Sequence, residues 1–292
     1  MDGTGETRES DAPVRVATAA DVAWLLDLAA DEGWNPGLDD LDAFRRADPG
    51  GFLVALEGDS PVAGLSVVRH DDAHAFLGLY LCRPDARGRG HGWRVWQAGL
   101  AHAGSRGVGL DGVPAQQANY RLSGFVPAWR NLRFEGAPPP TSPESLDLPS
   151  PRPARAADLD DLLALDRRVG GIRRDAFARC WFADTATRRT LLCRNGGETV
   201  AAGTIRACRE HHKVGPLFAD SPALARHLLA ALGREAAATR LVVDVPEGNG
   251  TAIRLCESLG LGPVFETTRM YRGAPPAVDL GRLYGIATLE LG

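Results

Sequence analysis

The sequence predicts a mixed α/β fold in which two domains of one kind, each a mixed sheet with flanking helices, follow one another along the chain. Three observations predict it. The chain has 292 residues, enough for two domains of ordinary size. Both halves show the same order of strands and helices, and Gly124-Phe125 recurs about 136 residues later as Gly260-Leu261. A proline-rich stretch separates the halves.

The first half, residues 14–136, has the pattern of one α/β unit. Its helices show apolar residues at helical spacing, and its strands show apolar runs bounded by turn residues. The run 76–82 is apolar throughout, which is typical of a buried central strand. In order, we expect an extended stretch (14–16), a capped helix (18–28), a hairpin (52–56 with 61–68), a strand (76–82), a helix (93–103), a strand (108–111), and a helix that ends at Gly124.

Residues 137–151 contain Pro138–Pro140, Pro143, Pro149 and Pro151, and they predict a stiff, extended linker because proline at this density continues neither a helix nor a central strand. The second half, residues 152–292, then repeats the order of elements. Its expected elements are a helix (157–165), a hairpin (190–193 with 199–205), strands at 213–218 and 241–244, and a helix that ends at Gly260.

The bulk composition is that of a globular protein in water. Hydrophobic residues make up 44% of the chain, charged residues make up 24%, and the net charge is −4. Such a charge gives no general attraction to nucleic acid or to an anionic membrane, so neither is expected as a partner. No apolar run approaches the roughly 18 residues of a membrane span. Residues 1–13 are polar and acidic, which predicts a disordered tail rather than a signal peptide.

The cysteines predict neither a disulfide framework nor a metal centre. The chain has 5 of them, an odd number without a Cys-x-x-Cys or Cys/His ligand spacing. The histidines are scattered as well, so no metal is expected. We therefore expect reduced thiols and a cytoplasmic protein. The sequence leaves open whether the protein is a monomer or a homodimer.

The segment Arg87–Gly92 predicts an anion site between the apolar strand and the following helix. The first amides of a helix have no partner within the helix, and the helix dipole is positive there. Glycines at 88, 90 and 92 let the backbone approach a phosphate, and Arg87 and Arg89 add charge. The Gly-Lys-Ser/Thr of a Walker loop is absent, and Trp93 does not fit a dinucleotide fingerprint. The alternative is a tight turn without a ligand.

The pattern Arg-x-x-Gly-x-Gly after a strand that ends in Arg83-Pro84 resembles the acetyl-CoA loop of the GNAT superfamily of N-acetyltransferases. The resemblance implies acetyl-CoA as co-substrate, and it implies that Leu81 and Cys82 bind the pantetheine arm through their backbone. It also implies that the pyrophosphate lies on Arg87, Gly88, Arg89, Gly90, His91 and Gly92.

The resemblance also implies a general acid. In the family a tyrosine four residues before the Gly-Phe pair protonates the leaving thiolate, and here that residue is Tyr120. The alternative is a tyrosine that only packs on the core. Many family members have an asparagine eleven residues before the glycine of the Gly-Phe pair, where this chain has Val113. Asn119, which lies next to Tyr120, is therefore a further candidate for contacts with coenzyme A.

The general base stays open at this point. Many family members carry a glutamate on the central strand, but Leu79 stands at the matching position. The candidates are Asp111, Glu32 or an ordered water. Asp111 ends a strand and has a counterpart in Asp244, so at least part of its role is expected to be structural.

Candidate acceptor-binding residues come from both halves. Trp34 and Asn35 follow the first helix, where the family's loop lies over the acceptor, although they also fit a helix stop with a packed aromatic side chain. Tyr80 lies on the central strand, and Lys213 is the sole lysine of the chain. Lys213 fits a carboxylate contact or a solvated strand end.

The second half lacks both the loop and the tyrosine. Ala219–Ala223 stands where the loop is expected, with an aspartate that we expect to cap the helix, and Cys256 replaces the tyrosine. The chain therefore resembles tandem GNAT proteins whose C-terminal domain is degenerate. The expected function is acetyl transfer to a primary amine, most simply of a small molecule. Alternatives are a non-catalytic acyl-CoA sensor and an acyltransferase that uses a longer acyl-CoA.

Overall fold

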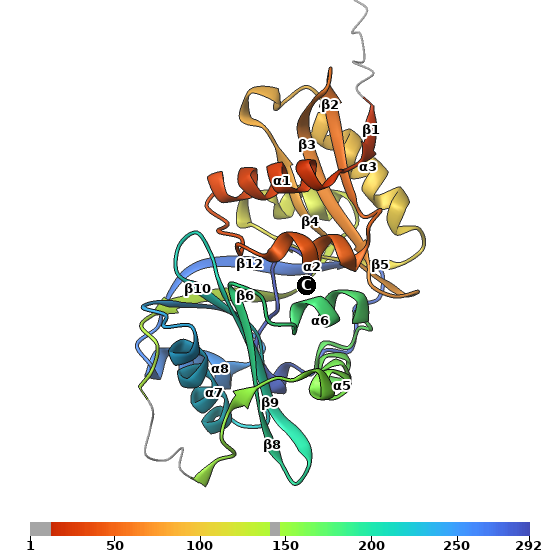
Figure 1. Ribbon diagram of the computed structural model, residues 1–292. Helices are drawn as coiled ribbons and strands as arrows, with labels where there is room; N and C mark the ends of the chain where they lie inside the picture. The colour runs from red at the N-terminus through yellow and green to blue at the C-terminus, as the bar shows by residue number, and fades with distance from the viewer. Residues whose placement is uncertain (1–12, 141–146) are drawn as a thin grey trace, which may run out of the picture.

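The computed structural model describes residues 13–140 and 147–292 (Figure 1). Most of the expected tail, 1–13, and the middle of the expected linker, 137–151, therefore lie outside the described residues. The described strands join in one sheet, in the order β1-β2-β3-β4-β5-β12-β6-β11-β10-β9-β8-β7, with β13 paired to β10. The mixed α/β class expected from the sequence is confirmed.

The strands of this sheet are β1 (Val14–Val16), β2 (Phe52–Glu57), β3 (Ser60–Arg69), β4 (His74–Cys82), β5 (Gly107–Gly112), β6 (Val126–Gly136), β7 (Arg152–Pro153), β8 (Arg188–Asn195), β9 (Glu198–Ala207), β10 (His212–Ala219), β11 (Leu241–Pro246), β12 (Gly262–Arg272) and β13 (Leu283–Gly285). The helices are α1 (Ala19–Asp31), α2 (Asp40–Ala47), α3 (His91–Ala103), α4 (Gln117–Leu122), α5 (Leu159–Gly170), α6 (Asp175–Trp181), α7 (Pro222–Glu235) and α8 (Gly250–Ser258).

Local sequence explains where α1 begins. The Thr18 side chain accepts a hydrogen bond from the Asp21 amide, and the Asp21 carboxylate accepts one from the Thr18 amide at 2.7 Å. This reciprocal capping satisfies two amides that a helix start leaves without partners. The apolar face of the helix, which includes Val22, Leu25 and Leu26, then packs into the core of the first half.

The two halves exchange their last long strands. β6 of the first half pairs with β11 of the second, and β12 of the second half pairs with β5 of the first. In Figure 1 the blue β12 accordingly lies beside the strands of the first half. The linker expected at 137–151 stays a prediction, and each half completes its sheet with a strand of the other.

Two buried ion pairs cross this exchange. Asp111 on β5 pairs with Arg269 on β12 at 2.7 Å, and Asp244 on β11 pairs with Arg133 on β6 at 2.7 Å. Each pair joins directly opposite positions of neighbouring strands. Because a buried charge without its partner is costly, these pairs favour the exchanged register over alternatives that would leave the charges apart.

The halves also share a hydrophobic core. Phe177 and Trp181 of α6 pack into the cluster formed by α1, α2 and the neighbouring strands of the first half, and Phe44 of α2 stacks on Trp181 at 6.2 Å between ring centroids. Figure 1 shows α2 and α6 lying against each other where the halves meet. The two halves therefore form one packed body.

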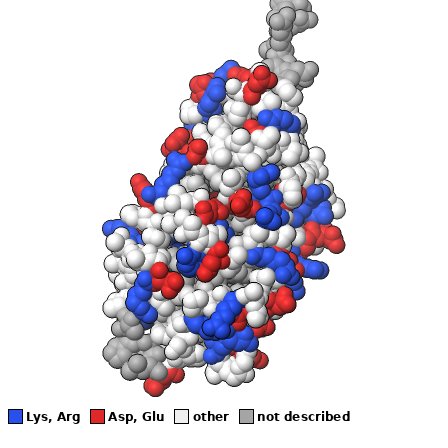
Figure 2. Space-filling model, in the orientation of Figure 1, with Lys and Arg blue, Asp and Glu red and all other residues white. Residues whose placement is uncertain are grey.

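The surface view in Figure 2 shows acidic and basic side chains interspersed, without a continuous basic surface on that face. None of the helices in the described ranges combines the length and apolar character needed to cross a membrane. Within those same ranges, no group of three or more His, Cys, Asp or Glu side chains is arranged to hold a metal ion.

Candidate active site

The site is built where β4 and β5 part. Their parallel pairing runs from His74 opposite Gly107 to Leu77 opposite Leu110 and stops there. Beyond this point β4 carries an extra residue relative to β3, because Gly78 pairs with Ser66 whereas Leu81 pairs with Gly64. Leu79 takes up the extra residue with a φ of 48°, in the left-handed region. The bulge turns the end of β4 away from β5 and frees its backbone groups on that side.

The loop after β4 leads to an open helix N-terminus. Gly88 and Gly90 have φ values of 77° and 82°, which residues with a side chain rarely adopt. α3 begins at His91, and among the described residues no side chain caps its first amides. The strand, the glycine turn and the uncapped helix end thus have the geometry that an anion site requires, and binding of an anion there stays a prediction.

The two loop arginines are held by carboxylates. Arg87 pairs with Glu32, and it also donates to the Cys82 carbonyl oxygen at 3.1 Å. Arg89 pairs with Glu57 at 2.8 Å. All four of these ion-paired side chains are at least a third exposed, so the pairs are weak and a phosphate can displace the carboxylates.

The imidazole of the predicted residue His91 is taken up by contacts within the protein. Its side chain is fully buried, and Nε2 lies 2.8 Å from the Glu57 carboxylate. The part of His91 that remains available to an anion is its backbone amide. Gly92 lies beneath Tyr80, since a Cβ built on Gly92 would lie 2.9 Å from the Tyr80 hydroxyl oxygen.

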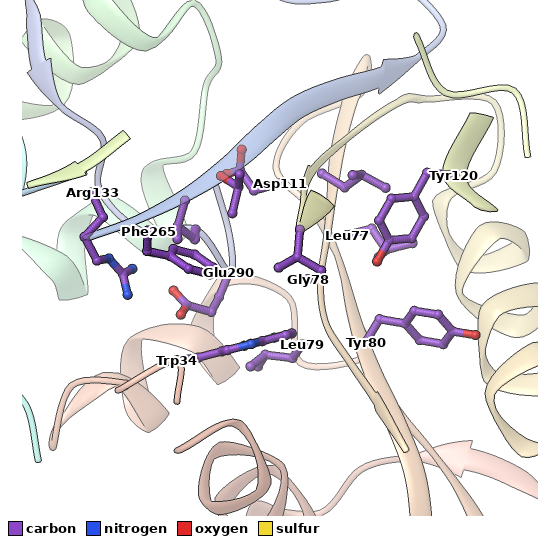
Figure 3. A pocket seen from close by; sticks show the side chains of 14 residues that line it. Trp34, Leu77, Gly78, Leu79, Tyr80, Asp111, Tyr120, Arg133, Phe265 and Glu290 are labelled. Carbon is purple, nitrogen blue, oxygen red and sulfur yellow. The ribbon is translucent and has the colours of Figure 1, made fainter. Parts of the chain in front are cut away.

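A pocket of about 510 Å³ opens between the two halves at the bulge. Figure 3 shows its labelled side chains converging from β4, from the loop after α1, from β6 and β12, and from the C-terminal segment. Its lining combines apolar side chains with a few polar ones and consists of Trp34, Leu77, Gly78, Leu79, Tyr80, Leu110, Asp111, Val113, Tyr120, Arg133, Phe265, Thr267, Leu289 and Glu290.

Tyr120 borders this pocket and a second hollow. That hollow is open to solvent and is lined also by Tyr80, Trp93 and Asn119. The Tyr120 ring stacks on Trp96 at 5.6 Å between centroids, and 8% of the residue is exposed. Burial raises the pKa of Tyr120 well above its usual range, and the nearby Tyr80 adds to the effect. The phenol therefore keeps its proton at neutral pH.

Asp111 reaches the pocket wall, but its carboxylate is occupied. Arg269 donates to both of its oxygens, at 2.9 and 2.7 Å, and Asn131 donates to Oδ1 at 2.7 Å. Burial raises the pKa of Asp111, and the guanidinium opposes this shift. A carboxylate with both oxygens bound is poorly placed to accept a proton from a substrate, so the geometry supports the structural part of the expected role.

Three further residues predicted for the site lie outside the pocket lining. Glu32 faces Arg87, as described above. Asn35 exchanges two hydrogen bonds with the backbone of Glu210, at 2.6 and 3.1 Å. Lys213 is buried and donates to the Trp34 carbonyl oxygen at 2.9 Å. Asn35 and Lys213 thus hold the Trp34 loop against the second half. Neither side chain faces the pocket, and Lys213 is not solvated.

Sequence analysis missed Glu290, which is 4% exposed and lies in the pocket wall. Its backbone crosses β4 so closely that a Cβ built on Gly78 would lie 1.9 Å from the Glu290 carbonyl oxygen. The available signal was an acidic residue within the otherwise apolar C-terminal stretch 286–291. That signal does not say which part of the fold the stretch will enter.

The opening between β4 and β5 has a counterpart in the second half, a gap between β10 and β11, and the chain itself fills that gap. The parallel pairing of β10 with β11 ends at Val214 opposite Val243, and β13 then pairs with β10 at Leu217. Ile286 continues this contact by donating its amide to the Asp244 carbonyl oxygen at 2.9 Å. A pantetheine arm would have to displace this C-terminal strand.

The helix that follows this closed gap is capped differently from our prediction. The Ser221 hydroxyl, rather than an aspartate, accepts from the amide of Leu224 at 3.2 Å. Asp220 instead pairs with Arg282. Serine is as good an N-cap as aspartate, and the arginine provides the aspartate with a partner outside the helix.

Comparisons with known proteins agree with this arrangement. A family model described as acetyltransferase (GNAT) family matches residues 19–125, and one described as acetyltransferase (GNAT) domain matches residues 162–285. The holothin acyltransferase of Pseudoalteromonas sp. (strain SANK 73390) is 33% identical over 263 residues, which are 89% of this chain and 88% of that protein.

Solved structures with the same fold include a protein from Pyrococcus horikoshii assigned as an acetyltransferase. It has a TM-score of 0.81 and 21% identity, with 96% of this chain and 95% of that chain covered. A tandem GNAT protein from the clavulanic acid biosynthesis pathway has a TM-score of 0.64 and 17% identity, with 89% and 97% covered.

Proposed function

Because this chain belongs to the GNAT family of acyltransferases, we propose that it transfers the acetyl group of acetyl-CoA to the primary amine of a small molecule. The reaction takes place at one site, in the first half. The observation that carries this proposal is the contrast between two equivalent gaps. The gap beside β4 is open and ends at an uncapped helix, whereas the gap beside β10 is filled by β13 and followed by a capped helix.

Acetyl-CoA binds along the open edge of β4. The backbone groups of Leu81 and Cys82 pair with the pantetheine amides, as a neighbouring strand would. The pyrophosphate lies on the amides at the start of α3. Arg87 and Arg89 exchange their carboxylate partners for phosphate oxygens, which bind a guanidinium in a fork geometry.

Backbone amides at the β4 bulge polarise the thioester carbonyl, because they are fixed in place before the reaction begins. The neutral amine attacks the carbonyl carbon, and the carbon–sulfur bond of the tetrahedral intermediate breaks. Tyr120 then donates its proton to the departing thiolate. A phenol, whose ordinary pKa is about 10, carries this proton at neutral pH.

The pocket supports a small acceptor with an apolar body. Trp34, Phe265 and Leu289 form much of its wall, and such apolar side chains suit a compact molecule with an apolar body. The second half covers this pocket through β12 and the C-terminal segment, next to β6 of the first half. A long peptide would need an open groove at this place, so the covered pocket favours a small molecule as the acceptor.

The test is release of coenzyme A thiol from acetyl-CoA in the presence of benzylamine, tryptamine, histamine and, as a bulky polar comparison, glucosamine. We expect turnover with at least one of the first three amines. Gly90→Glu is the matched control, because it places a negative charge at the pyrophosphate and strains a residue with a φ of 82°. Tight coenzyme A binding without thiol release, from acetyl-, butyryl- or octanoyl-CoA, would overturn the proposal. Release from a longer acyl-CoA alone would correct the donor.

A further inference from the structure

The C-terminal segment 286–292 connects the closed gap of the second half with the open pocket of the first. It leaves β13 beside Asp244, and its Leu291 carbonyl oxygen lies 2.8 Å from His70 Nε2. The final carbonyl oxygen, of Gly292, accepts from Arg174. Figure 1 places the C-terminus in the middle of the molecule, between the halves. The segment is therefore fixed at both ends and positions whatever side chains it carries.

One of those side chains, Glu290, projects into the pocket. Figure 3 shows it between Trp34 and Phe265, on the side of Gly78 opposite Tyr120. Its backbone touches Gly78, the first residue of β4 beyond the pairing with β5. The thioester must lie at this opening if coenzyme A follows β4. Glu290 and Tyr120 therefore flank the reacting carbon from two sides.

The carboxylate of Glu290 is held but not neutralised. Its Oε2 accepts from the Thr288 hydroxyl at 2.5 Å, and the same hydroxyl oxygen accepts from the Glu290 amide at 2.8 Å. Within the described parts of the chain, no cationic side chain forms an ion pair with Glu290 within 4.0 Å. The hydroxyl fixes the orientation of the carboxylate through Oε2, and no side-chain donor to Oε1 is present among the described residues.

The cations nearest to this part of the pocket have other partners. Arg133 binds both oxygens of Asp244, and Lys213 donates to the Trp34 carbonyl oxygen. The other carboxylate in the pocket wall, Asp111, is bound by Arg269 and Asn131. Of the acidic side chains lining the pocket, Glu290 is thus the one without a direct ion pair in the described structure. Arg133, Arg206 and Lys213 attract its carboxylate only from beyond ion-pair distance.

We propose that Glu290 is the proton acceptor of the reaction, taking the place of the acidic residue that β4 lacks at Leu79. The inference rests on the proposed amine acetylation. As the amine nitrogen bonds to the carbonyl carbon, its proton passes to the Glu290 carboxylate. The carbon–sulfur bond then breaks, and the thiolate takes the Tyr120 proton. After products leave, Glu290 loses its proton to solvent and Tyr120 regains one, so each group returns to its starting form.

The experiment compares the unaltered protein with Glu290→Gln and Glu290→Asp, using acetyl-CoA and the fastest amine among benzylamine, tryptamine and histamine. The matched control is Glu257→Gln, at an exposed position of α8 away from the pocket. For each variant, kcat, the KM of the amine, the Kd of coenzyme A and the melting temperature are measured. The Kd and melting temperature report whether the fold and the donor site are intact.

We expect Glu290→Gln to lower kcat about 100-fold or more, with the Kd of coenzyme A and the melting temperature unchanged. The kcat of Glu290→Asp should lie between those of Glu290→Gln and the unaltered protein, because aspartate keeps the base but shortens its reach. The kcat of Glu257→Gln should match that of the unaltered protein. A kcat of Glu290→Gln within about threefold of the unaltered protein would overturn the inference and leave the proposed function standing. A rise in amine KM alone would also overturn it, since Glu290 would then only bind the amine. Lack of turnover by the unaltered protein with every amine would remove both proposals.

Discussion

Replacing Arg269 with methionine removes the cation of the buried pair that joins β5 of the first half to β12 of the second. The Asp111 side chain is fully buried, and both of its contacts with Arg269 lie within 2.9 Å. Breaking such a pair typically costs about 3–5 kcal/mol, because a buried charge loses its partner. Asn131 still donates to Asp111 at 2.7 Å, so we expect the lower end, about 3 kcal/mol.

The assay is urea unfolding at pH 7, with thermal unfolding alongside. A loss of about 3 kcal/mol corresponds to a melting temperature lower by roughly 6–12 °C in a protein of this size. Without the guanidinium, the pKa of Asp111 rises further above its ordinary value, because only burial then acts strongly on it. A carboxyl with a raised folded pKa destabilises the fold once it ionises. The deficit of the variant should therefore shrink as the pH falls from 7 to 5.

A double-mutant cycle with Asp111→Asn makes this a test of the strand exchange. We expect a coupling of about 2 kcal/mol, since the two side chains are in direct contact. If β12 instead paired within its own half, Arg269 would not lie beside Asp111 and the two effects would add. A coupling below about 0.5 kcal/mol would refute the exchanged register.

Three further substitutions test separate parts of the account. Tyr120→Phe keeps the stacked ring and should lower kcat about 100-fold with unchanged coenzyme A affinity; an unchanged kcat would remove the tyrosine from the mechanism. The pKa of Asp21 is lowered to about 2, chiefly by Arg15. Asp21 therefore contributes stability above pH 4 that is lost as the pH falls towards 2. The contribution to the free energy of unfolding is about 1 kcal/mol, because Arg15 is partly exposed. Urea midpoints at pH 5 and pH 2.5 should differ less in Asp21→Asn than in the unaltered protein, and parallel curves would contradict this. Lys213→Met leaves the part-buried carbonyl of Trp34 without its donor and should cost about 1–3 kcal/mol while raising the amine KM. Normal stability and a normal KM in this variant would show that the contact does not position the Trp34 loop.

Local patterns predicted the parts of the site that lie close together in sequence. The apolar run 76–82 forms β4, and the glycines after it form the open start of α3, because a strand, a tight turn and a helix end depend mainly on their own residues. Tyr120 lies beside the site, as its spacing from Gly124 indicated by resemblance. Its role as the acid stays a prediction.

The strand exchange could not be predicted from the same patterns. β6 and β12 occupy equivalent places in the two repeats, so the hydrophobic pattern allows either strand to complete either half. The choice depends on contacts across more than 100 residues, such as Asp111 with Arg269 and Asp244 with Arg133. Local residue spacing reveals helices, strands and turns, but it carries no information about contacts between residues so far apart in the sequence.

Glu290 and Lys213 were difficult to place for the same reason. Lys213 looked like a strand-end residue, but the Trp34 loop of the other half covers it. Glu290 is far from the loop at 87–92 in sequence and enters the pocket only because the C-terminal segment fills the second gap and continues into the first. Tertiary contacts determine both positions.

We propose that this chain has one acyl-CoA site, in the first half, because its own C-terminal strand occupies the other gap. Isothermal titration of coenzyme A into the unaltered protein and into Gly90→Glu tests it directly. We expect one site per chain in the unaltered protein and no binding in the variant. Two sites per chain, or a single site that survives Gly90→Glu, would contradict it.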